Sequence, residues 1–103
     1  MDVGVSRQGE WGDMTIAIEN WKAGVDCTEM FKPLPEGRCQ CPHWGYVVKG
    51  RLRIKYADRE EVIGAGDAYH MEPGHIPVVE EDTELIEFSP LGEYQKTMAA
   101  LSG

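Results

Sequence analysis

The fold is decided by the stretch WGYVVKGRLRIKY, residues 44–56. In its second half, residues 51–56, basic and apolar side chains alternate one by one. Because successive side chains of a β-strand point to opposite faces, this pattern predicts a strand with one buried and one solvated face. In residues 44–48 both alternate sets are largely apolar, which predicts a strand covered on both sides. The Lys49-Gly50 pair between the two halves predicts a turn.

The same alternation continues on both sides of this stretch, from Met14 to Phe88. It predicts further strands, at residues 14–20, 27–31, 60–63, 68–71, 76–80 and 83–88. A loop over residues 32–37 contains two prolines and a glycine, which break any strand there. After Pro90 the apolar period changes to 3.6 residues, which predicts a short C-terminal helix over the barrel or a partner. The chain is therefore expected to be all-β, with six or more strands closing into a barrel.

Length and charge narrow the range of functions. A chain of 103 residues has room for one core, so we expect a single domain spanning residues 1–103. Ten Lys and Arg against eighteen Asp and Glu give a net charge of −8, which repels nucleic acid and anionic membranes, so neither is an expected partner. The N-terminal residues lack the pattern of a secretory signal, and no stretch approaches bilayer-spanning length, which favours a cytoplasmic protein. Three cysteines, an odd number, favour free thiols or metal ligands over a disulfide framework.

Two segments resemble the sequence motifs of the cupin superfamily: CQCPHWGYVVKG, residues 39–50, and GDAYHMEPGH, residues 66–75. The first ends in a strand-turn glycine, and the second begins with Gly-Asp and carries a Pro-Gly turn. Fifteen residues separate Gly50 from Gly66, a spacer similar to those of small bacterial single-domain cupins. The resemblance implies a cupin jelly-roll barrel, also called a double-stranded β-helix, with one central pocket for a small molecule of unknown identity.

The metal ligands usual in that family match this chain only in part. The family's set is two histidines separated by one residue, a glutamate a few residues on, and a later histidine. Here Gly37, Cys39 and His43 stand at the first three positions, and Pro77 stands at the last, with His75 two residues earlier. The standard three-histidine, one-glutamate centre is therefore absent.

A different ligand set could stand in its place. Cys39, Cys41 and His43 occupy alternate positions, so an extended chain would direct all three side chains to one face, although Pro42 could bend it. Thiolate and imidazole ligands suit a divalent transition metal such as zinc, iron, nickel or copper. The stiff Pro73-Gly74 turn could bring His75 to the same place as a fourth ligand. The sequence therefore predicts a metal site of Cys39, Cys41, His43 and His75.

Several alternatives remain open at this point. Cysteine is often a small buried hydrophobe, and His75 could be an exposed neighbour of a simple turn. His70 could face either the pocket or the outside. The chain is then either a metal-dependent small-molecule enzyme, a metal-free binding or sensing module, or a structural partner subunit, and no catalytic residue is assigned.

Self-association is a separate expectation. The strand at residues 44–48 is apolar on both faces, and so small a domain gains core by pairing. Dimers are also common among the proteins that this chain resembles. We therefore expect a homodimer.

Overall fold

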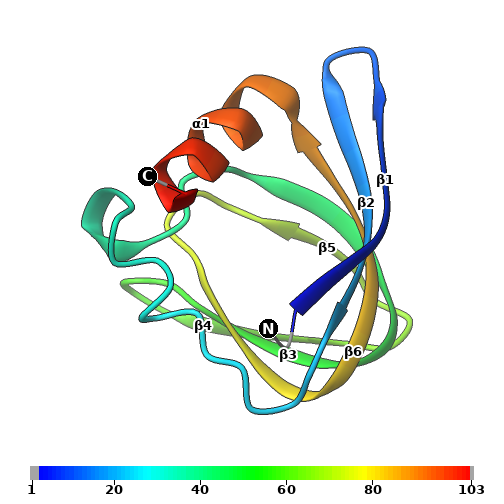
Figure 1. Ribbon diagram of the computed structural model, residues 1–103. Helices are drawn as coiled ribbons and strands as arrows, with labels where there is room; N and C mark the ends of the chain where they lie inside the picture. Colours follow the sequence, from blue (N-terminus) through cyan, green and yellow to red (C-terminus); the bar gives the residue numbers. More distant parts are fainter. Residues whose placement is uncertain (1–2, 103) are drawn as a thin grey trace.

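The computed structural model describes residues 3–102 and forms one antiparallel sheet curled into a barrel (Figure 1). The strand order is β1-β2-β6-β3-β4, with β5 paired to β3, which gives six strands. The all-β barrel and the C-terminal helix expected from the sequence are confirmed. The elements are β1 (Val3–Trp11), β2 (Met14–Trp21), a 3-10 turn (Pro35–Gly37), β3 (His43–Lys55), β4 (Glu60–Gly64), β5 (Ala68–Met71), β6 (Ile76–Pro90) and α1 (Leu91–Ser102).

β3 and β6 form the spine of the barrel. They pair with each other over nearly their whole lengths, from Trp44 opposite Phe88 to Lys55 opposite Ile76. At a bend between Val47 and Leu52 the pairing register shifts, and there β3 exchanges β5 for β4 as its other neighbour. The two long bent strands therefore belong to both sides of the barrel and enclose its interior.

The expected turn at Lys49-Gly50 is wrong, and so is the expected break between the strands at residues 76–80 and 83–88. Lys49-Gly50 and Glu81-Asp82 lie inside the continuous strands β3 and β6, opposite each other, where the strands bulge and bend. Gly50 has a φ of +97°, and a Cβ there would collide with the Thr83 side chain and the Asp82 carbonyl. Glycine and acidic residues mark a close approach of two bent strands here, and not a chain reversal.

The strand expected at residues 27–31 is also wrong. Oδ1 of Asp26 accepts hydrogen bonds from the Thr28 amide (2.9 Å) and hydroxyl (2.6 Å), and the Phe31 amide donates to the Cys27 carbonyl (2.9 Å). This local bonding holds the segment in successive turns. Conversely, no strand was expected at β1, which among the described strands pairs with β2 alone.

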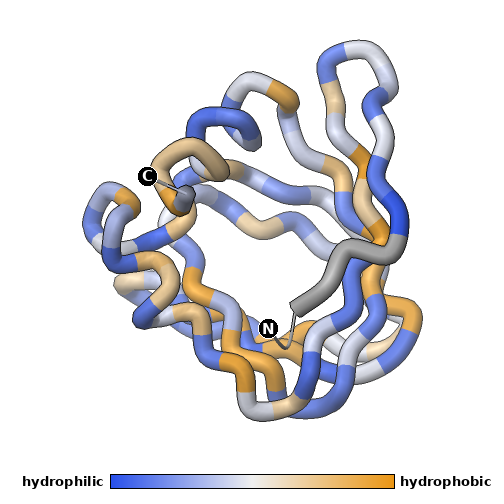
Figure 2. The backbone as a smooth tube through the Cα atoms, viewed as in Figure 1, coloured by the Kyte–Doolittle hydropathy of each residue, from blue (hydrophilic) through white to orange (hydrophobic). Residues whose placement is uncertain are grey.

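Two apolar clusters fill the barrel. One lies among the strands and contains Val47, Leu52, Ile54, Tyr56, Tyr69, Met71, Val79 and Leu85. The other lies beneath α1 and contains Cys27, Phe31, Leu34, Cys39, Cys41 and Ile76, with Tyr94, Ala100 and Leu101 of the helix packed against it. Figure 2 shows short hydrophobic and hydrophilic stretches following one another along the strands, as expected for walls with an inner and an outer face. No helix in residues 3–102 is long and apolar enough to cross a membrane.

Replacing Gly50 with alanine tests the bend. The left-handed φ and the collision with β6 together predict a loss of about 2–4 kcal/mol in the free energy of unfolding. Gly66→Ala is the matched control, because Gly66 also has a left-handed φ (+90°) but an added Cβ there meets nothing within 4 Å. The control should lose only about 1–2 kcal/mol. Equal losses in urea denaturation would show that the close approach of β3 and β6 contributes nothing.

Candidate metal centre

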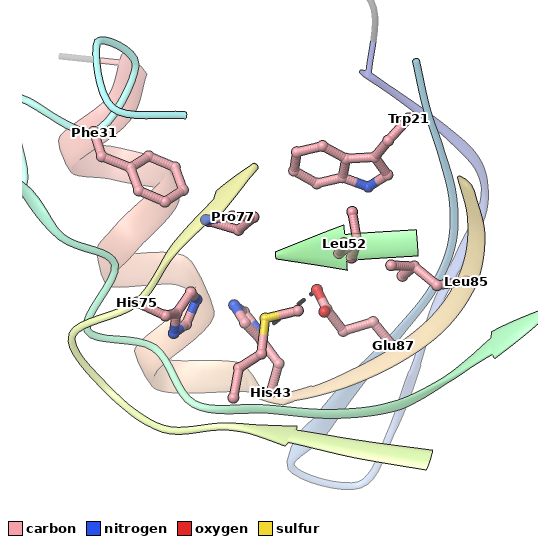
Figure 3. A pocket seen from close by; sticks show the side chains of 9 residues that line it. Trp21, Phe31, His43, Leu52, His75, Pro77, Leu85 and Glu87 are labelled. Carbon is pink, nitrogen blue, oxygen red and sulfur yellow. Dashed lines mark ion pairs between the residues drawn. The ribbon is translucent and has the colours of Figure 1, made fainter. Parts of the chain in front are cut away.

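Three potential metal ligands converge in the barrel: Cys39, His43 and His75. One ligand atom from each lies within 4.8 Å of the other two. Sγ of Cys39 is 3.7 Å from Nε2 of His43, and the two imidazole rings meet edge to face with centroids 5.0 Å apart. Figure 3 shows the two histidines facing each other across one end of the pocket. The structure thus brings together three of the four residues that the sequence predicted as ligands.

A backbone bridge sets Cys39 beside His75. The Cys39 amide donates to the His75 carbonyl (3.0 Å), and the Gly74 amide donates to the Cys39 carbonyl (2.7 Å). Gly74 has a φ of +95°, which lets the chain reverse between Pro73 and His75. His75 is only 1% exposed, so the alternative of a solvent-facing histidine at a simple turn is wrong.

The Nδ1 nitrogen of each histidine lies within hydrogen-bond distance of a neighbouring oxygen. Nδ1 of His75 donates to the Glu72 carbonyl at 2.7 Å. Nδ1 of His43 lies 2.6 Å from the Ser89 hydroxyl and 3.6 Å from a carboxylate oxygen of Glu87. Because a carbonyl only accepts, His75 carries its proton on Nδ1 and its Nε2 keeps a lone pair for a ligand. In the matching tautomer of His43, with Ser89 as acceptor, Nε2 also keeps a lone pair and faces the Cys39 thiol. Outer partners of this kind are those that orient metal-binding histidines.

Cys41 lies outside the converging group. The regular strand begins only at His43 and the chain bends at Cys41, so the alternation that was expected to align the three side chains does not extend that far. The Cys41 thiol lies 3.5 Å from the Pro42 carbonyl and is hydrogen-bonded to Ser89. It therefore shares Ser89 as a partner with His43 and does not join the converging ligand atoms.

The structure also shows where His70 and Cys27 lie relative to the pocket. His70 is exposed and stacks on the outer ring of Trp44, with centroids 4.7 Å apart and planes 5° apart, so it faces away from the pocket. Cys27 is completely buried in the apolar cluster beneath α1, as expected for a packing residue.

Burial sets the protonation of the three converging residues. It raises the pKa of the Cys39 thiol to about 11 and lowers the pKa of His43 to about 4. Burial and the neighbouring His43 lower the pKa of His75 to about 4. At neutral pH both imidazoles are in their ligating form, whereas the thiol must release a proton before it can bind a metal.

The spacing of these atoms suits a tetrahedral ion. Zinc–sulfur bonds of about 2.3 Å and zinc–nitrogen bonds of about 2.0 Å place neighbouring sulfur and nitrogen ligands roughly 3.5 Å apart. The observed separation between Cys39 Sγ and His43 Nε2 is 3.7 Å. This pair already has the spacing of two tetrahedral ligands, and all three ligand atoms lie within 4.8 Å of one another, so the set could close around a metal ion by side-chain movement.

Beside this group is a cavity of about 50 Å³. A water molecule occupies at least roughly 10–15 Å³ by the same measure, so the cavity has room for only a few heavy atoms. Its walls are mainly apolar, and both histidines and one carboxylate reach it. It is lined by Trp21, Phe31, His43, Leu52, Met71, His75, Pro77, Leu85 and Glu87 (Figure 3).

Sequence reasoning missed two buried carboxylates on the inner wall, Glu19 and Glu87. One oxygen of Glu87 accepts the Tyr69 hydroxyl at 2.7 Å, and one oxygen of Glu19 accepts the Trp21 indole N–H at 2.9 Å. Burial raises the pKa of both, and the charge of Glu87 raises that of Glu19 further. A signal was available, since both glutamates stand at inward positions of alternating strands, where apolar side chains are usual.

Gly45 makes room for one of these contacts. A Cβ on Gly45 would overlap the Tyr69 hydroxyl and the Ile86 carbonyl. Because Gly45 has no side chain, the phenol of Tyr69 on β5 can cross β3 and reach Glu87 on β6.

The raised pKa of Glu19 predicts a pH-dependent stability. Between the unfolded pKa and the raised folded pKa, the folded protein holds a proton that the unfolded chain has released, so stability is lost as pH rises through the folded pKa. Glu19→Gln removes this titration. From pH 6 to pH 9, the free energy of unfolding of the variant should gain more than about 1 kcal/mol relative to the parent.

The histidines do not disturb this comparison, because they are present in both proteins. Glu10→Gln, at an exposed position of β1, is the control and should leave the pH profile unchanged. Parallel profiles for Glu19→Gln and the parent, measured by chemical denaturation, would contradict a buried protonated Glu19.

Among known proteins, the chain finds matches in solved structures alone. No family model matches the chain, and no curated protein matches it. Solved structures do match.

Three of the matching structures cover most of the chain. A cupin-2 domain containing protein from Shewanella frigidimarina is 17% identical with a TM-score of 0.58, over 84% of this chain and 82% of that one. A cupin superfamily protein from Desulfitobacterium hafniense is 10% identical with a TM-score of 0.65, over 86% and 77%. A protein of unknown function from Rhizobium leguminosarum is 19% identical with a TM-score of 0.65, over 87% and 82%. These likenesses, together with the antiparallel barrel, show that the chain has the cupin jelly-roll fold.

Proposed function

We propose that this protein binds a divalent transition metal ion through Cys39, His43 and His75 and presents it to a small molecule in the barrel cavity. The observation that carries the proposal is the convergence of one thiol and two imidazoles, with one ligand atom of each within 4.8 Å of the other two, at one end of that cavity. Buried polar groups of this kind are stabilised by ligating a cation. Zinc is the metal expected first, because it accepts mixed sulfur and nitrogen ligands in tetrahedral sites, with iron, nickel and copper as competitors.

Three protein ligands leave one coordination position for water or substrate, where a bound metal acts as a Lewis acid. The protein's own residues supply the surroundings. Ser89 and Glu87 hold the orientation of His43, and the apolar wall formed by Leu52, Met71 and Leu85 limits access by bulk water. The size of the cavity restricts the ligand to a few heavy atoms.

The second candidate function is a metal-free pocket that binds a small molecule without turnover. It is favoured by the raised pKa of Cys39. A protonated thiol is a poor metal ligand, and it can line a pocket as an uncharged group. The two candidates differ in whether metal occupies the site at neutral pH.

The three free cysteines bear on location. Residues Cys27, Cys39 and Cys41 are all buried and unpaired. Free thiols suit a reducing compartment, and we place the protein in the cytoplasm on this ground.

A cysteine series tests the metal proposal. Titration calorimetry with zinc at pH 7.5 should show one ion per chain for the parent protein. Cys39→Ala should lower the affinity at least about 100-fold, because it removes the only thiol in the converging group. Cys27→Ala is the matched control for losing a buried thiol, and Cys41→Ala should also retain the ion, with at most a tenfold loss from its contact with Ser89.

The pH dependence of binding gives a second readout. While the thiol of Cys39 is protonated, zinc affinity should fall about tenfold for each unit that the pH is lowered. A parent protein that binds no zinc, nickel or iron, and whose melting temperature these ions leave unchanged, would favour the metal-free candidate. Loss of binding in Cys41→Ala equal to that in Cys39→Ala would put Cys41 back in the ligand set.

A further inference from the structure

The inner wall of the barrel buries two carboxylates, and no lysine or arginine among residues 3–102 is buried with them. The buried polar residues of the described chain are Thr15, Glu19, His43, His75, Thr83, Glu87 and Ser89. Both histidines have a pKa of about 4 and are therefore neutral at neutral pH. Buried carboxylates are usually paired with a cation or bound to a metal. The interior thus offers surroundings for a cation that the described chain does not itself supply.

The two carboxylates lie on neighbouring strands of the sheet. Glu87 of β6 stands opposite Ala17 of β2, and Glu19 of β2 stands opposite Leu85 of β6. All four side chains are buried, so the two glutamates are diagonal neighbours on the inner face. Their charges therefore act on the same part of the interior.

Glu87 presents its carboxylate to the cavity. The residue is only 9% exposed, and it lines the cavity together with both histidines (Figure 3). One oxygen accepts the Tyr69 hydroxyl at 2.7 Å, and the other lies 3.6 Å from Nδ1 of His43, beyond ordinary hydrogen-bond length. An ionised carboxylate can accept about four hydrogen bonds, so Glu87 keeps acceptor capacity for a ligand.

Two aromatic side chains line the same cavity. Figure 3 shows Trp21 and Phe31 at the opposite end of the pocket from His43. The indole N–H of Trp21 donates to Glu19 at 2.9 Å, which holds that ring in place. Aromatic rings attract a cation that lies over their face within about 6 Å, most strongly where water is excluded. A carboxylate and aromatic rings around one small cavity are groups that recognise an organic cation.

The size and walls of the cavity indicate which kind of cation it suits. Its volume of about 50 Å³ admits only a few heavy atoms. Leu52, Met71 and Leu85 offer apolar contacts to an alkyl group. A second metal ion suits it less, because neither glutamate belongs to the group of converging ligand atoms. A short alkyl chain that ends in an ammonium group meets all of these conditions.

We propose that the small molecule bound in the barrel cavity is a short-chain primary amine whose ammonium group donates a hydrogen bond to Glu87. This inference rests on the proposed binding of a small molecule in the cavity and specifies its class, but it does not require the metal. A bound ammonium ion also favours the charged form of a neighbouring carboxylate. The alkyl part then packs against the apolar wall.

NMR spectra of nitrogen-15-labelled, zinc-free protein test the proposal, with ethylammonium chloride as the probe at pH 8, where an alkylamine is still protonated. Trp21 is the one tryptophan of the three that lines the cavity, so its indole N–H resonance should shift and saturate. The Kd should be roughly millimolar, which is near the limit for a probe of three heavy atoms. The indole resonances of Trp11 and Trp44, which are exposed, are internal controls and should not shift.

Two further probes separate charge from size. Ethanol has the same shape as ethylammonium but no charge, and acetate is an anion of similar size. At equal ionic strength, both should bind at least about tenfold more weakly than ethylammonium, because neither offers Glu87 a cation. Equal shifts of the Trp21 resonance with ethanol and ethylammonium, or no shift with either, would overturn the proposal.

Glu87→Gln keeps the size of the side chain and removes its charge, so it should weaken ethylammonium binding at least about tenfold. Glu84→Gln is the matched control. Glu84 is on the same strand but at an outward position, so this variant loses an equal charge and should bind the probe as the parent does. Circular dichroism checks that both variants fold, and if Glu87→Gln does not, the comparison of probes in the parent still tests the proposal. Unchanged binding in a folded Glu87→Gln variant would overturn it.

Repeating the titration with added zinc separates this inference from the metal proposal. A protein that binds ethylammonium but no zinc would refute the metal proposal and leave the amine pocket standing. A protein that binds zinc but never ethylammonium would do the reverse.

Discussion

The backbone bridge between Cys39 and His75 is the constraint on which the candidate site depends. Its hydrogen bonds fasten the loop that precedes β3 to the turn that precedes β6, 36 residues further along the chain. His43 follows Cys39 by four residues at the start of β3, so the same bridge sets all three ligand atoms near one another. The cost of bringing distant segments together is therefore met by the fold before any ligand arrives, which is the meaning of a preorganised site.

Much of the fold follows from side-chain alternation alone. The strands expected at residues 60–63 and 68–71 are β4 and β5; Gly64 marks the end of β4, and Gly66 and Pro73 flank β5. Glycine led to a wrong prediction at Gly50, because glycine occurs in a bulge between long strands as readily as in a turn. Whether a glycine belongs to a turn or to a bulge depends on the residue opposite it in space. Opposite Gly50 this residue is Thr83, in a strand distant in sequence, which no local sequence pattern can indicate.

The site could be predicted from sequence in part, and for reasons that the structure makes clear. His75 followed from the stiffness of the Pro-Gly turn, whereas the position of Cys41 did not follow, because the bend before Pro42 ends the regular strand. Burial then acts on every polar group in the same direction, toward its neutral form: it lowers the pKa of His43 and raises those of Cys39 and Glu87. Without an ion, the Cys39 thiol and both imidazoles are thus uncharged at neutral pH, and binding a cation requires the thiol to release its proton.

The central claim is that one sulfur and two imidazole nitrogens form the ligand set. X-ray absorption spectroscopy of the zinc-loaded protein at pH 7.5 tests this most directly, because it counts sulfur and lighter ligands separately. The account predicts one sulfur at about 2.3 Å, two imidazole nitrogens at about 2.0 Å and one further light atom. A site with two sulfurs, or one with no sulfur at all, would contradict it.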